Sequence, residues 1–239
     1  MTAGTIVGFD TSTPRLTVAA TVRGEPAFER AQAPPEGERP GHARELLGAA
    51  EEAAEAVGGW RAVDAIAVGI GPGSYTGLRI GVATARGLAQ GLALSLAPVV
   101  SLMALARGIG DGFDDRGEPR FAVLDARRGQ VFAALYAGSG AELWQPFVAT
   151  PEEVAERLAT VDHAPLTAGD GSLRFRSQLE AAGAKVLADG DEAHLISARH
   201  LCVLAERVAP SEPADVEPIY LRPPDAELWR EQQRRQRSP

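Results

Sequence analysis

Short apolar runs and one helical pattern alternate in a fixed order along the first half of the chain. Residues 5–10 form an apolar run that ends in a carboxylate, which predicts a buried strand. Residues 15–22 and 26–30 predict two further strands joined by a turn, and apolar positions over residues 42–57 recur at helical spacing. The order continues as strand, helix, strand and helix, with predicted ranges of 64–70, 75–94, 98–100 and 102–109.

The second half of the chain repeats this order after a polar, glycine-bearing stretch at residues 110–118. Three strands come first, and Thr150 then caps a helix that has Pro151 at its first position. The remaining elements again alternate between strand and helix. The predicted ranges are 120–125, 130–137, 142–149, 166–168 and 184–187 for strands, and 172–182 and 195–208 for the helices after the one at Pro151.

Three strands followed by alternating helices and strands, occurring twice, is the plan of the actin-like ATPase fold of the sugar kinase, Hsp70 and actin superfamily. We therefore expect a duplicated α/β fold with two lobes. The expected boundaries are residues 1–110 for the N-terminal lobe and 111–223 for the C-terminal lobe. Residues 224–239 form a basic tail that we expect to be disordered.

The composition is that of an ordinary soluble globular protein, and it argues against several classes of function. The formal net charge of −8 argues against a long-range electrostatic grip on nucleic acid. The single cysteine, Cys202, excludes an intramolecular disulfide and a multi-cysteine metal site. No apolar run is long enough to span a bilayer, and residues 1–10 do not resemble a signal peptide. We therefore expect a cytoplasmic protein without membrane contact.

Two carboxylates occupy matching places in the two halves. Asp10 ends the first strand and precedes Thr11 and Ser12, and Asp125 ends the corresponding strand and is followed two residues later by Arg127. In an actin-like fold both turns reach a central cleft, where such a carboxylate faces hydrated magnesium. A hydroxyl-capped turn behind a strand-terminal aspartate, with no ligand, is the simpler alternative for each motif by itself.

A glycine-rich loop leaves the predicted strand at 64–70 and opens the next helix. This is the context in which glycines and a helix N-terminus hold an anion, and Ser74 is placed to cap the helix. The loop is neither a Walker A motif nor the dinucleotide fingerprint. With the two carboxylate turns it predicts a cleft derived from a nucleotide or phosphate site, made of Asp10, Thr11, Ser12, Gly71, Gly73, Ser74, Asp125 and Arg127.

Small residues follow two stripes of the helix after this loop. Gly77, Gly81 and Ala85 lie four apart on one stripe, and Gly87 and Gly91 lie on a neighbouring one. A glycine inside a helix costs about 1 kcal/mol relative to alanine, so the close approach of another element has to offset that cost. The helix is therefore either packed tightly inside its own lobe or part of a subunit interface.

Residues 71–79, GPGSYTGLR, closely resemble the signature of the TsaB family, also called YeaZ. Other segments resemble that family in the same order along the chain, from about residue 5 to residue 223. They are residues 8–13 (GFDTST), His42 with Leu46 and Leu47, residues 125–127 (DAR) with the strand at 131–132, and residues 217–222 (EPIYLR).

The resemblance implies an inactive paralogue of TsaD that supports TsaD and TsaE in adding threonylcarbamoyl to adenosine 37 of tRNA. It implies that the helices at residues 42–57 and 75–94 bind TsaD, or pair with a second copy when TsaD is absent. We expect tRNA contact only through the complex and no required cofactor, with a weak ATP or ADP contact in the complex left open. The expected contact residues are His42, Leu46, Leu47, Tyr75, Gly77, Leu78, Gly81 and Ala85.

Metal chemistry is not expected. The TsaD family binds its metal with two histidines four apart on the first helix, but here His42 is followed at that spacing by Leu46. We therefore expect no catalytic residue and no turnover by the chain alone. Two enzyme alternatives stay open, an ATP-dependent kinase that uses Asp10, Asp125 and the loop at 71–74, and an M22-type peptidase, against which the missing metal pair argues.

Overall fold

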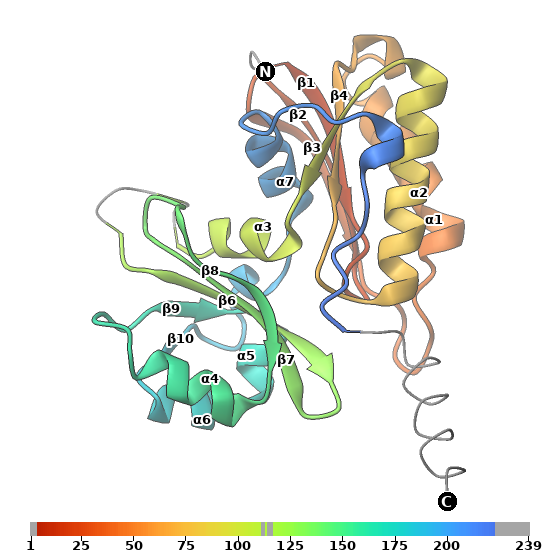
Figure 1. The fold of residues 1–239 in the computed structure, drawn as a ribbon. Helices are drawn as coiled ribbons and strands as arrows, with labels where there is room; N and C mark the ends of the chain where they lie inside the picture. The colour runs from red at the N-terminus through yellow and green to blue at the C-terminus, as the bar shows by residue number, and fades with distance from the viewer. Residues whose placement is uncertain (1–3, 111–112, 114–116, 223–239) are drawn as a thin grey trace, which may run out of the picture.

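Two five-stranded mixed sheets, each covered by helices, form two lobes that lie side by side (Figure 1). The computed structural model describes residues 4–110, 113 and 117–222. The basic tail that the sequence predicts at 224–239 lies outside the described residues, as does part of the 110–118 stretch. No helix in the described part of the chain is long and apolar enough to cross a membrane.

The sheet of the N-terminal lobe has the strand order β3-β2-β1-β4-β5. β1 pairs antiparallel with β2 and parallel with β4, so a three-stranded meander is extended by parallel strands that helices connect. The elements of this half are β1 (Thr5–Asp10), β2 (Leu16–Val22), β3 (Glu25–Gln32), α1 (His42–Glu55), η1 (Trp60–Ala62), β4 (Ala65–Gly69), α2 (Tyr75–Leu92), β5 (Ser95–Val99) and α3 (Ser101–Arg107).

The sheet of the C-terminal lobe repeats this topology in the order β10-β9-β6-β7-β8. β6 pairs antiparallel with β7 and parallel with β9, as β1 does with its two neighbours. The elements of this half are β6 (Arg120–Arg127), β7 (Gln130–Tyr136), β8 (Glu142–Ala149), α4 (Pro151–Leu158), β9 (Leu166–Ala168), α5 (Asp170–Arg174), α6 (Arg176–Ala181), β10 (Lys185–Val186), η2 (Glu192–His194), α7 (Ala198–Ala205) and η3 (Pro213–Asp215).

The duplicated actin-like order predicted from the sequence is therefore confirmed, although several element ranges differ; the helix predicted at 195–208, for example, spans Ala198–Ala205. The strand predicted at 98–100 spans Ser95–Val99. The single helix predicted at 172–182 is two helices, α5 and α6, which meet at Phe175. The backbone of Phe175 leaves the helical region (φ −113, ψ 26) because its ring packs into the core of the C-terminal lobe.

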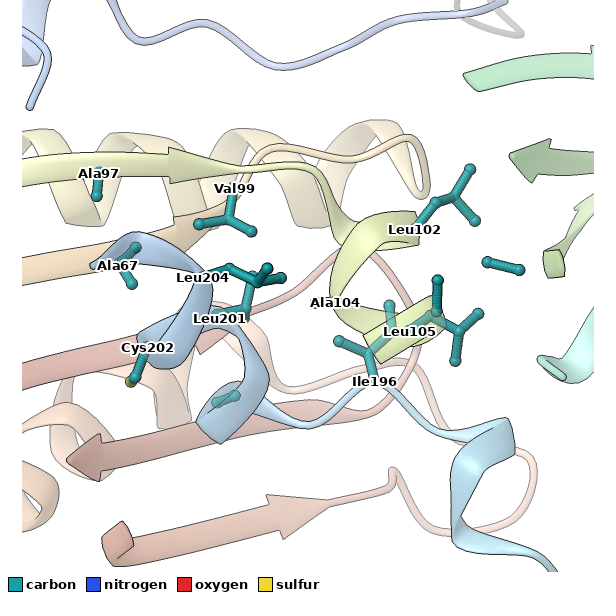
Figure 2. Packing of buried hydrophobic residues seen from close by; sticks show 14 of the residues in the cluster. Ala67, Ala97, Val99, Leu102, Ala104, Leu105, Ile196, Leu201, Cys202 and Leu204 are labelled. Atoms are coloured by element: carbon teal, nitrogen blue, oxygen red, sulfur yellow. The ribbon is translucent and has the colours of Figure 1, made fainter. Parts of the chain in front are cut away.

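The last α-helix of each half, α3 in the first and α7 in the second, packs against the sheet of the other lobe. α1 and α2 cover one face of the N-terminal sheet, and α7, from the second half of the chain, covers the other face (Figure 1). In return, α3 packs on β6 and β7 of the C-terminal lobe. Figure 2 shows this shared core, where Leu105 of α3 lies beside Ile196, and Leu201 and Leu204 of α7 lie beside Val99 of β5. One continuous core therefore joins the lobes behind the cleft.

Candidate functional site: an interlobe cleft and an open helix face

A cavity of about 590 Å³ lies between the lobes. It combines hydroxyl groups and helix α2's first turn from the N-terminal lobe with charged groups from the C-terminal lobe. Residues 219–222, near the end of the described chain, form a further part of its wall. Its polar and aromatic lining residues are Ser12, Thr13, Ser74, Tyr75, Thr76, Asp125, Arg127, Phe132, Asp170, Tyr220 and Arg222.

Asp10 does not line this cavity, and its carboxylate is buried and hydrogen-bonded inside the N-terminal lobe. The residue is 1% exposed. Its Oδ1 accepts hydrogen bonds from the backbone N–H and the hydroxyl of Ser12 (2.7 and 2.6 Å), and its Oδ2 accepts one from the Ser101 hydroxyl (2.6 Å). Burial raises the pKa of the Asp10 carboxyl, and these hydrogen bonds oppose the rise. In this arrangement Asp10 fixes the turn after β1.

The Gly71–Ser74 loop packs directly on the turn after β1. The Ser74 N–H donates to the carbonyl of Ser12 (2.7 Å), and a side chain at Gly73 would overlap that residue. The Gly71 N–H donates to the Ser101 hydroxyl (3.0 Å), while the Ser101 N–H donates to the Gly71 carbonyl (2.8 Å). The amides of Gly71 and Ser74, which the sequence offered as anion donors, are therefore engaged within the protein. Ser74 does cap α2 as predicted, since its hydroxyl accepts from the Gly77 N–H (3.3 Å).

Asp125 lies at the cleft but is neutralised by neighbouring arginines. Its Oδ1 accepts from the Arg127 N–H (2.8 Å), and its Oδ2 accepts from the Arg174 guanidinium (2.8 Å). The Asp125 N–H in turn donates to Asp170 (2.9 Å), whose carboxyl pKa is raised by burial. The structure therefore places Asp125 and Arg127 at the cavity, with Asp170 and Arg174 as partners of Asp125. Asp170 lies in a Gly-Asp-Gly triplet at residues 169–171.

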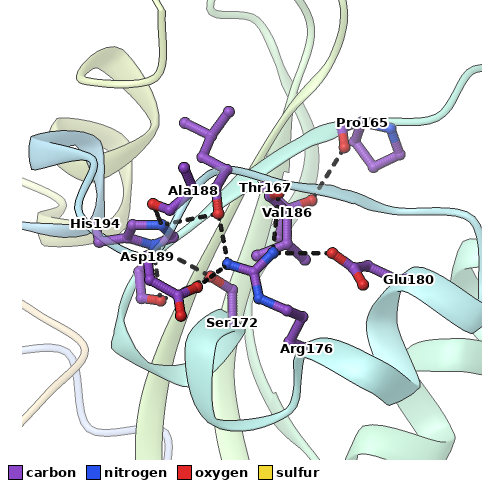
Figure 3. A network of polar contacts seen from close by, with 11 residues as sticks. Pro165, Thr167, Ser172, Arg176, Glu180, Val186, Ala188, Asp189 and His194 are labelled. Carbon is purple, nitrogen blue, oxygen red and sulfur yellow. Dashed lines mark hydrogen bonds and ion pairs between the residues drawn. The ribbon is translucent and has the colours of Figure 1, made fainter.

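A polar network around His194 and Arg176 (Figure 3) anchors Gly169, the residue before Asp170. The Gly169 N–H donates to Nδ1 of His194 (3.1 Å), and Nε2 of His194 donates to the Ala188 carbonyl (3.0 Å). Because an N–H group can only donate and a carbonyl can only accept, the His194 ring carries its proton on Nε2. Arg176 of α6 holds residues 187–189, to which His194 also bonds, through the Leu187 carbonyl (2.6 Å) and Asp189 (2.5 Å). His194 thus helps to hold the backbone next to the cleft residue Asp170.

The segment at 219–222 crosses the cleft mouth. The Ile219 N–H donates to the Ile70 carbonyl (2.8 Å), and the Arg222 guanidinium donates to Gln130 of the C-terminal lobe (3.3 Å). Between them, the Tyr220 ring packs on the Tyr75 ring with centroids 4.8 Å apart. The segment therefore links the first turn of α2 to the opposite lobe. Sequence reasoning used Tyr220 only as part of a family motif and gave it no place in a site.

Most residues expected to contact a partner are instead packed inside the N-terminal lobe. The carbonyl and hydroxyl of Thr11 occupy the space that side chains at Gly77 and Gly81 would need. Of the expected residues only Leu47 is largely exposed (56%), and Tyr75 is half-buried. The buried residues are His42, Leu46, Gly77, Leu78, Gly81 and Ala85, which hold α1 and α2 on the sheet and, placed as they are, offer no surface to a partner.

The outward face of α1 and α2 nevertheless stays open. The two helices lie side by side along the N-terminal lobe (Figure 1). Side chains added at Gly48, Gly87 or Gly91 would meet no atom within 4 Å. Leu47 is exposed beside Gly48 on α1. This surface, which we term the helix face, combines exposed apolar and small residues of α1 and α2, namely Ala43, Leu47, Gly48, Ala83, Gly87 and Gly91.

Fold and cleft together define a duplicated protein of the actin-like ATPase superfamily. Within residues 4–110, 113 and 117–222, no group of three or more His, Cys, Asp or Glu side chains could hold a metal ion. The carboxylates at the two matching turns accept hydrogen bonds from neighbouring residues. Two further features of this protein are the Gly71–Ser74 loop, whose amides bond within the protein, and the exposed outward face of α1 and α2.

Comparison with known proteins places the chain within this superfamily. Residues 33–211 match the family model described as TsaD: tRNA N6-adenosine threonylcarbamoyltransferase. The tRNA threonylcarbamoyladenosine biosynthesis protein TsaB of Escherichia coli is 33% identical over 168 residues, 67% of this chain and 71% of the relative. An uncharacterised protein of Mycobacterium tuberculosis is 30% identical over 229 residues, 93% of each chain. The solved structure of YeaZ from Pseudomonas aeruginosa is 28% identical with a TM-score of 0.74, covering 91% of this chain and 100% of that one. The chain belongs to the TsaB family.

Proposed function

We propose that this chain is a non-catalytic subunit in the biosynthesis of N6-threonylcarbamoyladenosine in tRNA, and that it binds and supports the TsaD subunit together with TsaE. Family membership supports the pathway, because the Escherichia coli relative is named a tRNA threonylcarbamoyladenosine biosynthesis protein. The observation that carries the non-catalytic role is the state of Asp10. Its two carboxylate oxygens accept three hydrogen bonds inside the lobe, and the residue does not line the cleft in which the kinase alternative would need it.

The partner site in this proposal is the helix face. Glycines at 87 and 91 leave room for a partner helix to approach α2 closely, and Leu47 supplies exposed apolar area on α1. The contact set therefore shifts from the buried residues named above to outward neighbours on the same two helices. A second copy of the chain is the alternative occupant when TsaD is absent. The complex contacts tRNA through its other subunits, and the chain requires no cofactor of its own. A weak ATP or ADP contact exists at most in the assembled complex.

The test is complex formation with TsaD from the same organism, measured by size-exclusion chromatography with light scattering and by titration calorimetry. Gly87→Arg places a long charged side chain on the helix face, and no neighbouring atom within 4 Å opposes it in the free chain. Gly190→Arg is the matched control, because Gly190 also has no neighbour within 4 Å but lies in the C-terminal lobe. We expect a one-to-one complex for the unmodified chain and for the control. Gly87→Arg is expected to bind at least about thirtyfold more weakly, the effect of losing an interface centre.

Two outcomes contradict the proposal. Unchanged binding of Gly87→Arg would place TsaD on another surface. Absence of any complex, combined with ATP hydrolysis or phosphoryl transfer by the chain alone, would make the kinase alternative correct.

A further inference from the structure

The turn between β1 and β2 touches both helices of the helix face from below. We define this turn as residues 11–13. The Thr11 hydroxyl donates to the Gly77 carbonyl in the first turns of α2 (2.7 Å), and the Ser12 carbonyl accepts from the Ser74 N–H at the α2 cap (2.7 Å). The Thr13 carbonyl accepts from Nε2 of His42, the first residue of α1 (3.0 Å). Three successive residues thus hold the starts of two helices.

These contacts fix the position of the turn relative to α1 and α2. Thr11 is completely buried and Ser12 is 2% exposed. Because Gly77 and Gly81 have no side chains, α2 lies directly against the carbonyl and hydroxyl of Thr11. Asp10 holds the turn itself through two hydrogen bonds to Ser12. A shift of the turn therefore has to be followed by α2 or has to break these bonds.

The same turn also lines the cavity between the lobes. Ser12 and Thr13 form part of its wall, facing Asp125 and Arg127 of the other lobe. The backbone carbonyls of Ser12 and Thr13 are the groups that accept hydrogen bonds from the start of α2 and from α1, respectively. The cavity wall and the support of the helix face are consequently one element of the chain.

We propose that residues 11–13 are positioning residues for partner binding, which set the relative placement of α1 and α2 and couple it to the interlobe cavity. Thr11 is the residue through which the positioning of α2 is most directly tested, because its hydroxyl makes a single side-chain bond to α2. The inference rests on the proposed function in that the helix face binds TsaD. By thermodynamic linkage, a ligand that shifts this turn from the cavity side changes the affinity for TsaD by the same factor by which TsaD changes the affinity for that ligand.

The experiment compares two buried threonines whose hydroxyls donate to backbone carbonyls. Thr11→Val removes the bond to Gly77, and Thr167→Val removes the bond from Thr167 to Pro165 (3.0 Å) in the C-terminal lobe. Both side chains are completely buried, so each variant loses one buried hydrogen bond at nearly constant shape. Dissociation constants for TsaD are measured by calorimetry on the full chain, with circular dichroism to verify folding. Hydrogen exchange of the free chain reports on the amides of residues 75–81.

Thr11→Val is expected to bind TsaD about fivefold more weakly or worse and to exchange faster at residues 75–81. Thr167→Val is expected to stay within about twofold of the unmodified chain, as befits a distant site. Thr11→Ser keeps the hydroxyl and is expected to restore most of the affinity. Equal weakening by both valine variants, or no change for Thr11→Val, would overturn the inference. If the unmodified chain does not bind TsaD, the proposed function fails, whereas unchanged exchange at residues 75–81 refutes the positioning role separately.

Discussion

Two glycines of one helix are expected to respond in opposite ways to the same substitution. Gly77 and Gly87 both lie inside α2, which spans Tyr75–Leu92. A methyl group at Gly77 would overlap the Thr11 carbonyl oxygen and lie 3.2 Å from its carbon, whereas a methyl group at Gly87 would meet no atom within 4 Å. Alanine at the two positions therefore separates packing inside the lobe from intrinsic helix propensity.

The magnitudes follow from the contacts. Alanine gains about 1 kcal/mol over glycine in a helix interior, and at Gly87 nothing opposes this gain. At Gly77 the same gain is opposed by overpacking against backbone, about 1–3 kcal/mol, and by loss of the Thr11 hydrogen bond, about 1 kcal/mol. Gly87→Ala should therefore stabilise the protein by about 1 kcal/mol and Gly77→Ala should destabilise it by about 1–3 kcal/mol.

The assay is urea unfolding followed by circular dichroism, with the free energy of unfolding compared at equal slope. The unmodified chain is the reference for both variants. A Gly77→Ala protein as stable as the unmodified chain would mean that α2 can move away from Thr11 without loss. That result would refute both the tight packing described here and the positioning role of the turn.

Two further predictions concern the end of α2 and the junction of α3 and α7. Ala93 ends α2 in the left-handed conformation (φ 55), so Ala93→Gly should raise the free energy of unfolding by about 1 kcal/mol, measured by urea unfolding. Burial, with the nearby charges of Arg199 and Arg107, lowers the pKa of His200 to about 4. The unfolded chain, with a histidine pKa of about 6.5, then binds more protons below that pH, so this contribution to stability is lost as the pH falls from about 6.5 to 4. Between pH 7 and pH 5 the loss should be about 2 kcal/mol more for the unmodified chain than for His200→Gln, and equal slopes for the two proteins would contradict the pKa assignment.

The order of elements could be read from the sequence because most elements carry their own local signals. The strands that both faces bury appear as continuous apolar runs, such as residues 64–70. Thr150 and Glu153 form the reciprocal capping box that starts α4, and the residue types at these two positions are visible without a structure. The break at Phe175 has no such signal, because it depends on where that ring packs in the core. Local chemistry thus predicts the elements, and tertiary packing decides where one is interrupted.

The site was less readable because its decisive contacts join distant residues. The prediction that Asp10 faces a nucleotide cleft depended on its position at the end of a strand. What removes it from the cleft is the hydroxyl of Ser101, which follows it by 91 residues, together with Ser12. Likewise, apolar periodicity predicted the helix at residues 42–57, but it could not say that Leu46 faces the sheet while Leu47 faces outward.

The two glycine stripes of α2 have different physical causes, and this difference bears on function. The cost of glycine at positions 77 and 81 is offset within the lobe, since only there can the helix approach Thr11 so closely. Glycine at positions 87 and 91, and at Gly48 on α1, gives no closer packing in the free chain, because no atom lies within 4 Å of where a side chain would be. Each leaves a helix about 1 kcal/mol less stable than alanine would. An unopposed cost at three positions on one exposed surface is accounted for if a second molecule packs there, which is the role that the proposed function assigns to the helix face.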